Sequence, residues 1–260
     1  MIEKRTVFIL GAGASCPYGF PTAAILRNGI IRDFRQSYSS LIGASTGREQ
    51  QWICEGYPEL SVVDTFLTVF DKSTTASIDL FLSRQPQFET IGKLAVAQSI
   101  LWAEKKSKPP GKVSEPDHDY DWFFCLYDRL TRELTGSDGY QKFAAHKIAF
   151  ITFNYDRSLE HFLFESLLHS FEGADAQKVH AQVDRIPIIH VYGRPAPLPW
   201  EEDDASKAFA YGDYGSLSSH NFLAMTKNLY VVHEERASPE LERARRQIQD
   251  AERIFFLGFG

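Results

Sequence analysis

Residues 10–21 read LGAGASCPYGFP, and this stretch decides the expected fold. It follows the apolar run Thr6–Leu10, which is typical of a buried strand, and it precedes residues 22–35, which favour a helix. Gly11 and Gly13 permit a sharp turn and a close approach of an anion to the main chain. Such a strand–turn–helix segment commonly binds the pyrophosphate of a dinucleotide. The stretch therefore predicts a nucleotide-binding α/β fold.

The same stretch argues against a common dehydrogenase. The dehydrogenase fingerprint has a third glycine or an alanine three residues after the second glycine. Cys16 occupies that position in this chain. A small-molecule oxidoreductase therefore ranks below the two functions considered below.

Composition indicates a packed, soluble protein of 260 residues, of which 43% are hydrophobic and 13% aromatic. The formal charge of −6 gives no electrostatic support for nucleic-acid binding. No apolar run approaches the roughly 20 residues of a membrane span. The start of the chain lacks the layout of a signal peptide, and Cys16, Cys54 and Cys125 are far apart, so we expect a cytoplasmic protein without disulfides.

Five short apolar or β-branched runs are expected to form a parallel sheet, since strands covered on both faces lack polar alternation. They are Thr6–Leu10, Lys147–Phe153, Ile186–Val191, Leu229–His233 and Arg253–Leu257. We expect one α/β domain over residues 1–260, with a Rossmann-like doubly wound parallel sheet. Its core takes about residues 1–35 and 147–260, and a helical insertion over about residues 36–146 follows the first strand and helix.

Helical periodicity is expected in segments 62–70, 77–82, 92–105 and 122–134, whereas the charged, proline-rich segment 105–119 favours a loop. At the end of the chain, Gly258-Phe259-Gly260 stands where a turn should lead into a covering helix. The sequence therefore predicts a domain that is incomplete at its C-terminus.

Four segments together resemble the sirtuin superfamily, which cleaves the nicotinamide–ribose bond of NAD. They are Gly11-Ala12-Gly13-x-Ser15 with Gly19-x-Pro21, Thr152-Phe153-Asn154-Tyr155-Asp156 with Leu159-Glu160, His190-Val191-Tyr192-Gly193, and Phe256-Leu257-Gly258-Phe259-Gly260. They occur in the order that the family has. Residues 77–82 and 91–95 also resemble the prokaryotic sirtuin-like effectors of antiviral defence.

The chain departs from the protein-deacylating sirtuins. Those enzymes hold a structural zinc ion with four cysteines, which three scattered cysteines cannot supply. They also follow the G-x-P segment with Asp-Phe-Arg, where this chain has Thr22, Ala23 and Ala24. The resemblance therefore implies an NAD hydrolase that acts in abortive infection, with NAD as substrate and without a metal. It further implies a homo-oligomer, and a partner ATPase or sensor subunit.

The resemblance assigns NAD binding to Gly11, Ala12, Gly13, Ser15, Pro21, Asp156, Tyr192, Gly193 and Gly258. The glycine turn would hold the phosphates, and Asp156 would bind the nicotinamide carboxamide. Catalysis is assigned to Asn154, whose amide both donates and accepts hydrogen bonds, and to His190 as the base. The family has histidine directly before the glycine, where this chain has Tyr192, but an imidazole accepts protons near neutral pH. On an extended strand, His190 and Tyr192 would face the same way, roughly 6.6 Å apart.

Each of these residues also has a purely structural interpretation. Asn154 would satisfy a turn, Asp156 would cap a helix from Arg157 to His169, and His190 would be a satisfied core histidine. With His190 in the core, the protein would be a catalytically inactive module that binds NAD or ADP-ribose. Both interpretations stay open at this point.

Overall fold

The computed structural model describes residues 1–43, 56–107, 121–204, 206–217, 219–230 and 239–259. Four parallel strands form one sheet in the order β3-β2-β1-β4. Their bounds are Thr6–Leu10 for β1, Ile148–Thr152 for β2, Ile188–His190 for β3 and Arg253–Leu257 for β4. Four of the five predicted strands are thus confirmed.

The remaining predicted strand, Leu229–His233, lies partly outside the described residues, which stop at Tyr230 and resume at Pro239. Within the described part, Leu229 forms an isolated antiparallel bridge with Gly193. This segment therefore contacts the loop after β3, and its described residues do not extend the parallel sheet.

Helices lie at each segment for which the sequence predicts one, whereas the three described helices after residue 175 have no counterpart among the predicted segments. Between β1 and β2 lie α1 (Ala23–Leu41), α3 (Leu60–Lys72), α4 (Ile78–Arg84), α5 (Glu89–Lys106) and α6 (Trp122–Thr131). The later helices are α7 (Ser158–Ser170), α8 (Ala176–Val183), α9 (Ser219–Met225) and α10 (Pro239–Gln249). Short 3-10 turns include η1 (Ala12–Ala14), η2 (Cys16–Tyr18), η4 (Pro86–Phe88), η6 (Gly139–Ala145), η7 (Tyr214–Ser216) and η8 (Thr226–Asn228). The predicted loop over 105–119 begins two residues later, after α5, and its residues 108–119 lie outside the described part.

Side-chain caps explain where several helices begin. The side chain of Thr22 accepts from the Ile25 N–H at the start of α1, and Ser77 does the same for α4. Aspartates serve the same purpose before α6 and α8, where Asp121 and Asp175 accept from backbone N–H groups. Such caps satisfy N–H groups that have no partner inside the helix.

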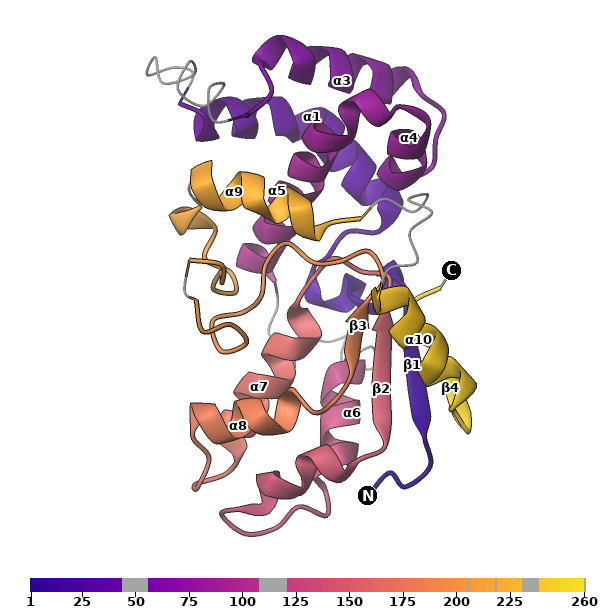
Figure 1. Cartoon of the computed structure of the whole chain (residues 1–260), viewed down its shortest axis with the longest axis vertical. Coiled ribbons are helices and arrows are strands. Elements are labelled where there is room, and N and C mark those ends of the chain that lie inside the picture. The colour runs from indigo at the N-terminus through magenta and orange to yellow at the C-terminus, as the bar shows by residue number, and fades with distance from the viewer. Residues whose placement is uncertain (44–55, 108–120, 205, 218, 231–238, 260) are drawn as a thin grey trace.

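Helices α1, α3, α4, α5 and α9 form the upper part of the molecule, and the strands point toward it with their carboxyl ends (Figure 1). Apolar side chains of these helices make one core that extends from Leu26 in α1 to Met225 in α9. Helix α5 is buried on nearly all sides within it, from Ile91 to Glu104. The helical part therefore lies over the edge of the sheet where the strands end.

The two faces of the sheet pack against different helices. Phe150 and Leu10 share a core with residues of α6 and α7, such as Phe123 and Leu163. Val7, Ile9 and Ile151 belong to a smaller cluster that includes Ala244 of α10, and Figure 1 shows α10 in front of the sheet. At the outer strand β4, Ile254, Phe255 and Phe256 are exposed.

The fold is α/β with a four-stranded parallel sheet, compatible with a Rossmann-like arrangement. Reading from β3 to β4, the sequence order of the strands is 3-2-1-4, which matches the first four positions of that fold. Helix α6 and η6 pack with the core of the sheet, whereas α1 packs with the helical part. The boundaries of an insertion at residues 36 and 146 stay a prediction. In parallel α/β sheets, ligands bind outside the carboxyl ends of the strands, so the site is sought there.

Candidate functional site

Segments that are far apart in the sequence meet at the carboxyl ends of β1, β2 and β3. The Asn154 Nδ2 group donates to the Gly11 carbonyl oxygen at 3.0 Å and to Ser15 Oγ at 2.9 Å. Nδ1 of His190 is 3.0 Å from the Asn154 carbonyl oxygen. The structure thus brings the two residues predicted to be catalytic into direct contact, and it links both to the glycine turn.

The direction of the Asn154 amide is fixed by its surroundings. A reversed amide would place Oδ1 against the Gly11 carbonyl oxygen, and two acceptors cannot share a hydrogen bond. Asn154 is 8% exposed, and its buried Oδ1 atom has no hydrogen-bond partner among the described residues. An unpaired buried acceptor is costly. Asn154 therefore presents an unused acceptor inside the site.

His190 is held by the protein at both ring nitrogens. Nδ1 donates to the Asn154 carbonyl oxygen, since a carbonyl can only accept, and Nε2 is 2.6 Å from Glu160 Oε1. The side chain is 7% exposed. This is the environment that the core-histidine interpretation expects. In this arrangement His190 positions the Asn154 backbone, and it would have to release a partner before it could accept a proton from a ligand.

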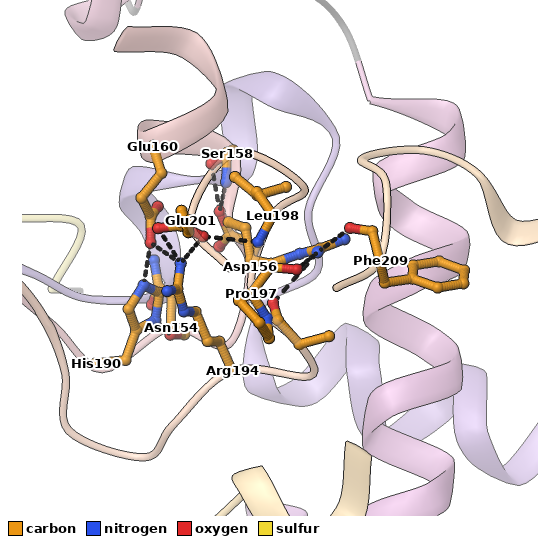
Figure 2. Close-up of polar contacts among 12 residues, drawn as sticks. Asn154, Asp156, Ser158, Glu160, His190, Arg194, Pro197, Leu198, Glu201 and Phe209 are labelled. Carbon is orange, nitrogen blue, oxygen red and sulfur yellow. Dashed lines mark hydrogen bonds and ion pairs between the residues drawn. The ribbon is translucent and has the colours of Figure 1, made fainter. Parts of the chain in front are cut away.

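Glu160 has a second partner besides His190. Arg194 Nη1 lies 3.2 Å from Glu160 Oε1 and makes shorter contacts, of 2.8 and 2.9 Å, with the carboxylate of Glu201. Figure 2 shows His190 and Arg194 converging on the same glutamate. Burial acts to raise the pKa of Glu160, but the neighbouring His190 and Arg194 outweigh it and lower this pKa to about 2. Glu160 is therefore a buried, ionised carboxylate.

Asp156 has a different environment, although it lies only four residues earlier. Its Oδ1 accepts from the N–H of Ser158 at 3.2 Å and from the Ser158 hydroxyl. Burial raises the pKa of Asp156, against the opposing effect of hydrogen bonds from Ser158 and Ser15, and the charge of Glu160 adds to the rise. Helix α7 begins at Ser158 with Arg157 at the N-cap position, one residue later than the structural interpretation expects, and Asp156 accepts from the first N–H of this helix. Binding of a carboxamide by Asp156 stays a prediction.

The glycine turn uses most of its own N–H groups. The Gly11 N–H donates to the Leu257 carbonyl oxygen and the Gly13 N–H to that of Gly258, at 2.9 and 3.0 Å. The Ser15 N–H donates to the Ala12 carbonyl oxygen. Gly258 has φ +73°, and a Cβ atom there would lie 1.9 Å from the Ala14 nitrogen. The close approach that these glycines permit is therefore made by another part of the chain. Phosphate binding by this turn stays a prediction.

The expectation that His190 and Tyr192 lie on one extended strand is wrong. Strand β3 ends at His190, and the Gly193 N–H donates to the His190 carbonyl oxygen across a turn. Gly193 has φ +73° and approaches residue Asn228 so closely that a Cβ atom would lie 1.8 Å from its carbonyl oxygen. The half-buried Tyr192 ring contacts Phe153 at 5.6 Å, away from the cavity described next. Pro21, also half-buried, precedes the cap of α1.

A small cavity lies where these segments meet, with about 10 Å³ of room, which is enough for about one water molecule. Leucine, isoleucine and aromatic side chains form part of its wall. Its polar lining residues are Ser15, Thr152, Asn154, Asp156, Ser158, Glu160 and His190. The cavity thus joins the predicted catalytic pair to both buried carboxylates.

Sequence analysis missed the importance of Glu160, Arg194 and Arg157. Glu160 was noted only as part of a motif, yet its place one turn into α7 directs it at His190. Arg157 is fully buried and forms a bidentate pair with Glu104 of α5, at 3.0 and 2.6 Å. It also donates to the Phe209 carbonyl oxygen, so it links the helical part to the start of α7. The signal available in the sequence was Arg157 itself, because an arginine directly before an apolar helix needs a buried acidic partner.

Within the described ranges, no group of three or more His, Cys, Asp or Glu side chains is arranged to hold a metal ion. In the same ranges, no helix has the length and apolar character to cross a membrane. A scan of protein-family models and searches of curated proteins and of solved structures find no match to this chain.

Proposed function

We propose that this protein hydrolyses NAD at the nicotinamide–ribose bond and releases nicotinamide and ADP-ribose. The observation that carries the proposal is the convergence of Asn154, Ser15 and His190 from three strand ends on one polar network with an unpaired amide oxygen. The segments that supply these residues are three of the four that resemble the sirtuin superfamily. We also propose that the fold is doubly wound and that the helical part is an insertion that lies over the site.

The chemistry needs few groups, because nicotinamide leaves as a neutral molecule from a cationic ring. The positive charge that develops on the ribose resembles that of glycoside hydrolysis. Asn154 Oδ1 would accept from the attacking water or a ribose hydroxyl, and the polar network would fix its direction. The glycine turn would face the phosphates, where the Ala12 N–H makes no main-chain bond among the described residues. Tyr192, Gly193, Pro21 and Gly258 would line the path of the coenzyme.

The biological setting is proposed from the resemblance alone. The protein would act in the cytoplasm as an abortive-infection effector, whose activity depletes cellular NAD. It would assemble with itself, and its trigger would be a partner ATPase or sensor subunit.

An inactive module that binds NAD or ADP-ribose is the second candidate. It is favoured by a specific observation: both ring nitrogens of His190 are bonded inside the protein, and Tyr192 stands where the family has its histidine. Such a module would bind the dinucleotide without turnover.

Nicotinamide release from NAD separates the two candidates. We expect turnover by the wild-type protein and a loss of at least about 100-fold in Asn154→Ala, since positioned polar groups contribute about this much. Asn28→Ala, an exposed change on α1, is the matched control and should leave turnover unchanged. NAD binding measured by calorimetry without any nicotinamide release would favour the regulatory module, and absence of both would end the proposal.

A further inference from the structure

Two buried acceptor atoms that have no partner in the described part of the chain belong to residues that line the same cavity. They are Asn154 Oδ1 and Glu160 Oε2, and both residues are more than nine-tenths buried. Leaving such atoms unpaired is costly, so a donor is expected there. The room in the cavity suits a donor of the size of one water molecule.

The other polar side-chain atoms of these two residues already make hydrogen bonds. Asn154 Nδ2 is bonded to Gly11 and Ser15, and Glu160 Oε1 is bonded to His190 and Arg194. Both side chains are therefore fixed, and neither can turn its unpaired oxygen to a protein donor without breaking these bonds. A water molecule that donates one hydrogen to each oxygen satisfies both at once.

We propose that this cavity binds the hydrolytic water between Asn154 Oδ1 and Glu160 Oε2, and that Glu160 accepts its proton. The role of this water as the nucleophile rests on the proposed NAD hydrolysis. Its presence in the cavity does not depend on that function. Because the water donates both of its hydrogens, its lone pairs stay available for bond formation. His190 is then a positioning residue, which holds Glu160 Oε1 and the Asn154 backbone.

The step balances without a further reactant. The water oxygen forms a bond to C1′ of the nicotinamide ribose, and the bond from C1′ to the ring nitrogen breaks. Its electron pair goes to the nicotinamide ring and neutralises the positive charge. One water proton passes to Glu160 Oε2 and then to solvent. A weak base is sufficient, because a water oxygen that has bonded to the sugar carbon becomes strongly acidic.

The charged and titratable groups around Glu160 keep its carboxylate ionised, as a base must be. Among the described residues they are His190 at the end of β3, Arg194 after it, Asp156 before α7, and Glu201 through Arg194. With its pKa lowered to about 2, the Glu160 carboxylate stays ionised throughout the physiological range. Turnover that depends on Glu160 as base should therefore show no loss on acidification until well below about pH 5.

The first test is a high-resolution crystal structure of the wild-type protein. We expect an ordered water within about 2.6–3.2 Å of both Asn154 Oδ1 and Glu160 Oε2. Absence of density, or a direct protein donor on either oxygen, would overturn the site. Anomalous density after a soak in a rubidium salt would identify a monovalent cation there and would overturn the assignment of water.

The second test is nicotinamide release by Glu160→Gln, with Glu165→Gln on the exposed face of α7 as the matched control. We expect a fall of about 100-fold or more in kcat for Glu160→Gln, with the Kd for NAD unchanged, and wild-type values for the control. An active Glu160→Gln variant would remove the role of Glu160 and leave NAD hydrolysis standing. A wild-type protein without turnover would instead remove the proposed function.

The pH profile of the wild-type kcat needs no variant, and it distinguishes Glu160 from a histidine as the base. A Glu160 base gives a flat profile between about pH 8 and about pH 5, whereas a free imidazole base gives an acid limb near about 6.5. A limb near 6.5 would return the base role to a histidine and contradict the inference.

Discussion

The two carboxyl groups of the cavity lie four residues apart and are both buried, yet their environments act in opposite directions. The side around Glu160 contains the imidazole of His190 and the guanidinium of Arg194, which lower the pKa of Glu160 despite burial. The side around Asp156 offers only hydroxyl and N–H donors, mainly from Ser158 and Ser15, and burial raises its pKa. Burial therefore does not decide the charge of a carboxyl group in this site. The nearest cation does.

A third buried carboxylate, in the helical part, is also paired with a cation. Glu104, near the end of α5, is 2% exposed, and Arg157 binds it with two hydrogen bonds. Three buried acidic side chains thus show the range from a fully paired carboxylate to one held by neutral donors. Variants at these carboxylates and their partners test how far pairing controls stability.

Removal of Arg157 should have the largest effect. Arg157→Ala leaves the charge of Glu104 buried without its partner, and breaking such pairs costs about 3–5 kcal/mol. Unfolding in urea, followed by circular dichroism, measures the change in unfolding free energy. Arg32→Ala breaks a pair with Asp33 that is exposed on the surface, and it should destabilise the protein far less. Equal losses in the two variants would contradict the importance of burial.

Replacement of Glu160 should remove a pH-dependent part of the stability. Its folded pKa of about 2 lies below its ordinary value of 4.5, so its contribution is present above pH 4.5 and is lost as the pH falls toward 2. This difference corresponds to about 3 kcal/mol. We expect Glu160→Gln to be less stable than the wild type by about that amount at pH 7, with the gap closing on acidification. A gap that is constant with pH would rule out this linkage.

Arg194 should contribute a smaller part of the stability that depends on the ionised Glu160. Arg194→Gln removes one of the two cations at Glu160, so the pKa of Glu160 should rise and the acid transition should begin at a higher pH. Because Arg194 is 26% exposed, we expect a loss of about 1–2 kcal/mol at pH 7. Chemical unfolding at several pH values measures both changes. An unchanged acid transition would show that His190 alone stabilises the glutamate.

Asp156→Asn should have the smallest effect on stability. The folded pKa of Asp156 is raised, so its favourable contribution is present below the unfolded value of about 3.9 and is lost as the pH rises through the folded value. The asparagine oxygen can still accept from the Ser158 N–H. We expect a change within about 1 kcal/mol at pH 7, and a variant that gains on the wild type as the pH rises. Unfolding curves at pH 4 and pH 8 would reveal the opposite trend if Asp156 were paired with a cation.

The sequence predicted the fold better than the site. Buried strands such as Ile148–Thr152 are marked by continuous apolar residues, and this local signal suffices to place them. The network around Glu160 depends on three strand ends meeting, which no local pattern encodes. Gly193 and Gly258 each make room for another backbone segment, and their predicted contact with a ligand stays a prediction. A glycine signals close approach, and the sequence does not say what approaches.

Hydrolysis of NAD in ¹⁸O-labelled water tests the proposed function most directly, with the products separated and weighed by mass spectrometry. We expect equal amounts of nicotinamide and ADP-ribose from the wild-type protein, with one ¹⁸O atom in each ADP-ribose, and neither product above background from Asn154→Ala. Wild-type protein that binds NAD and returns it intact and unlabelled would contradict hydrolysis at this site.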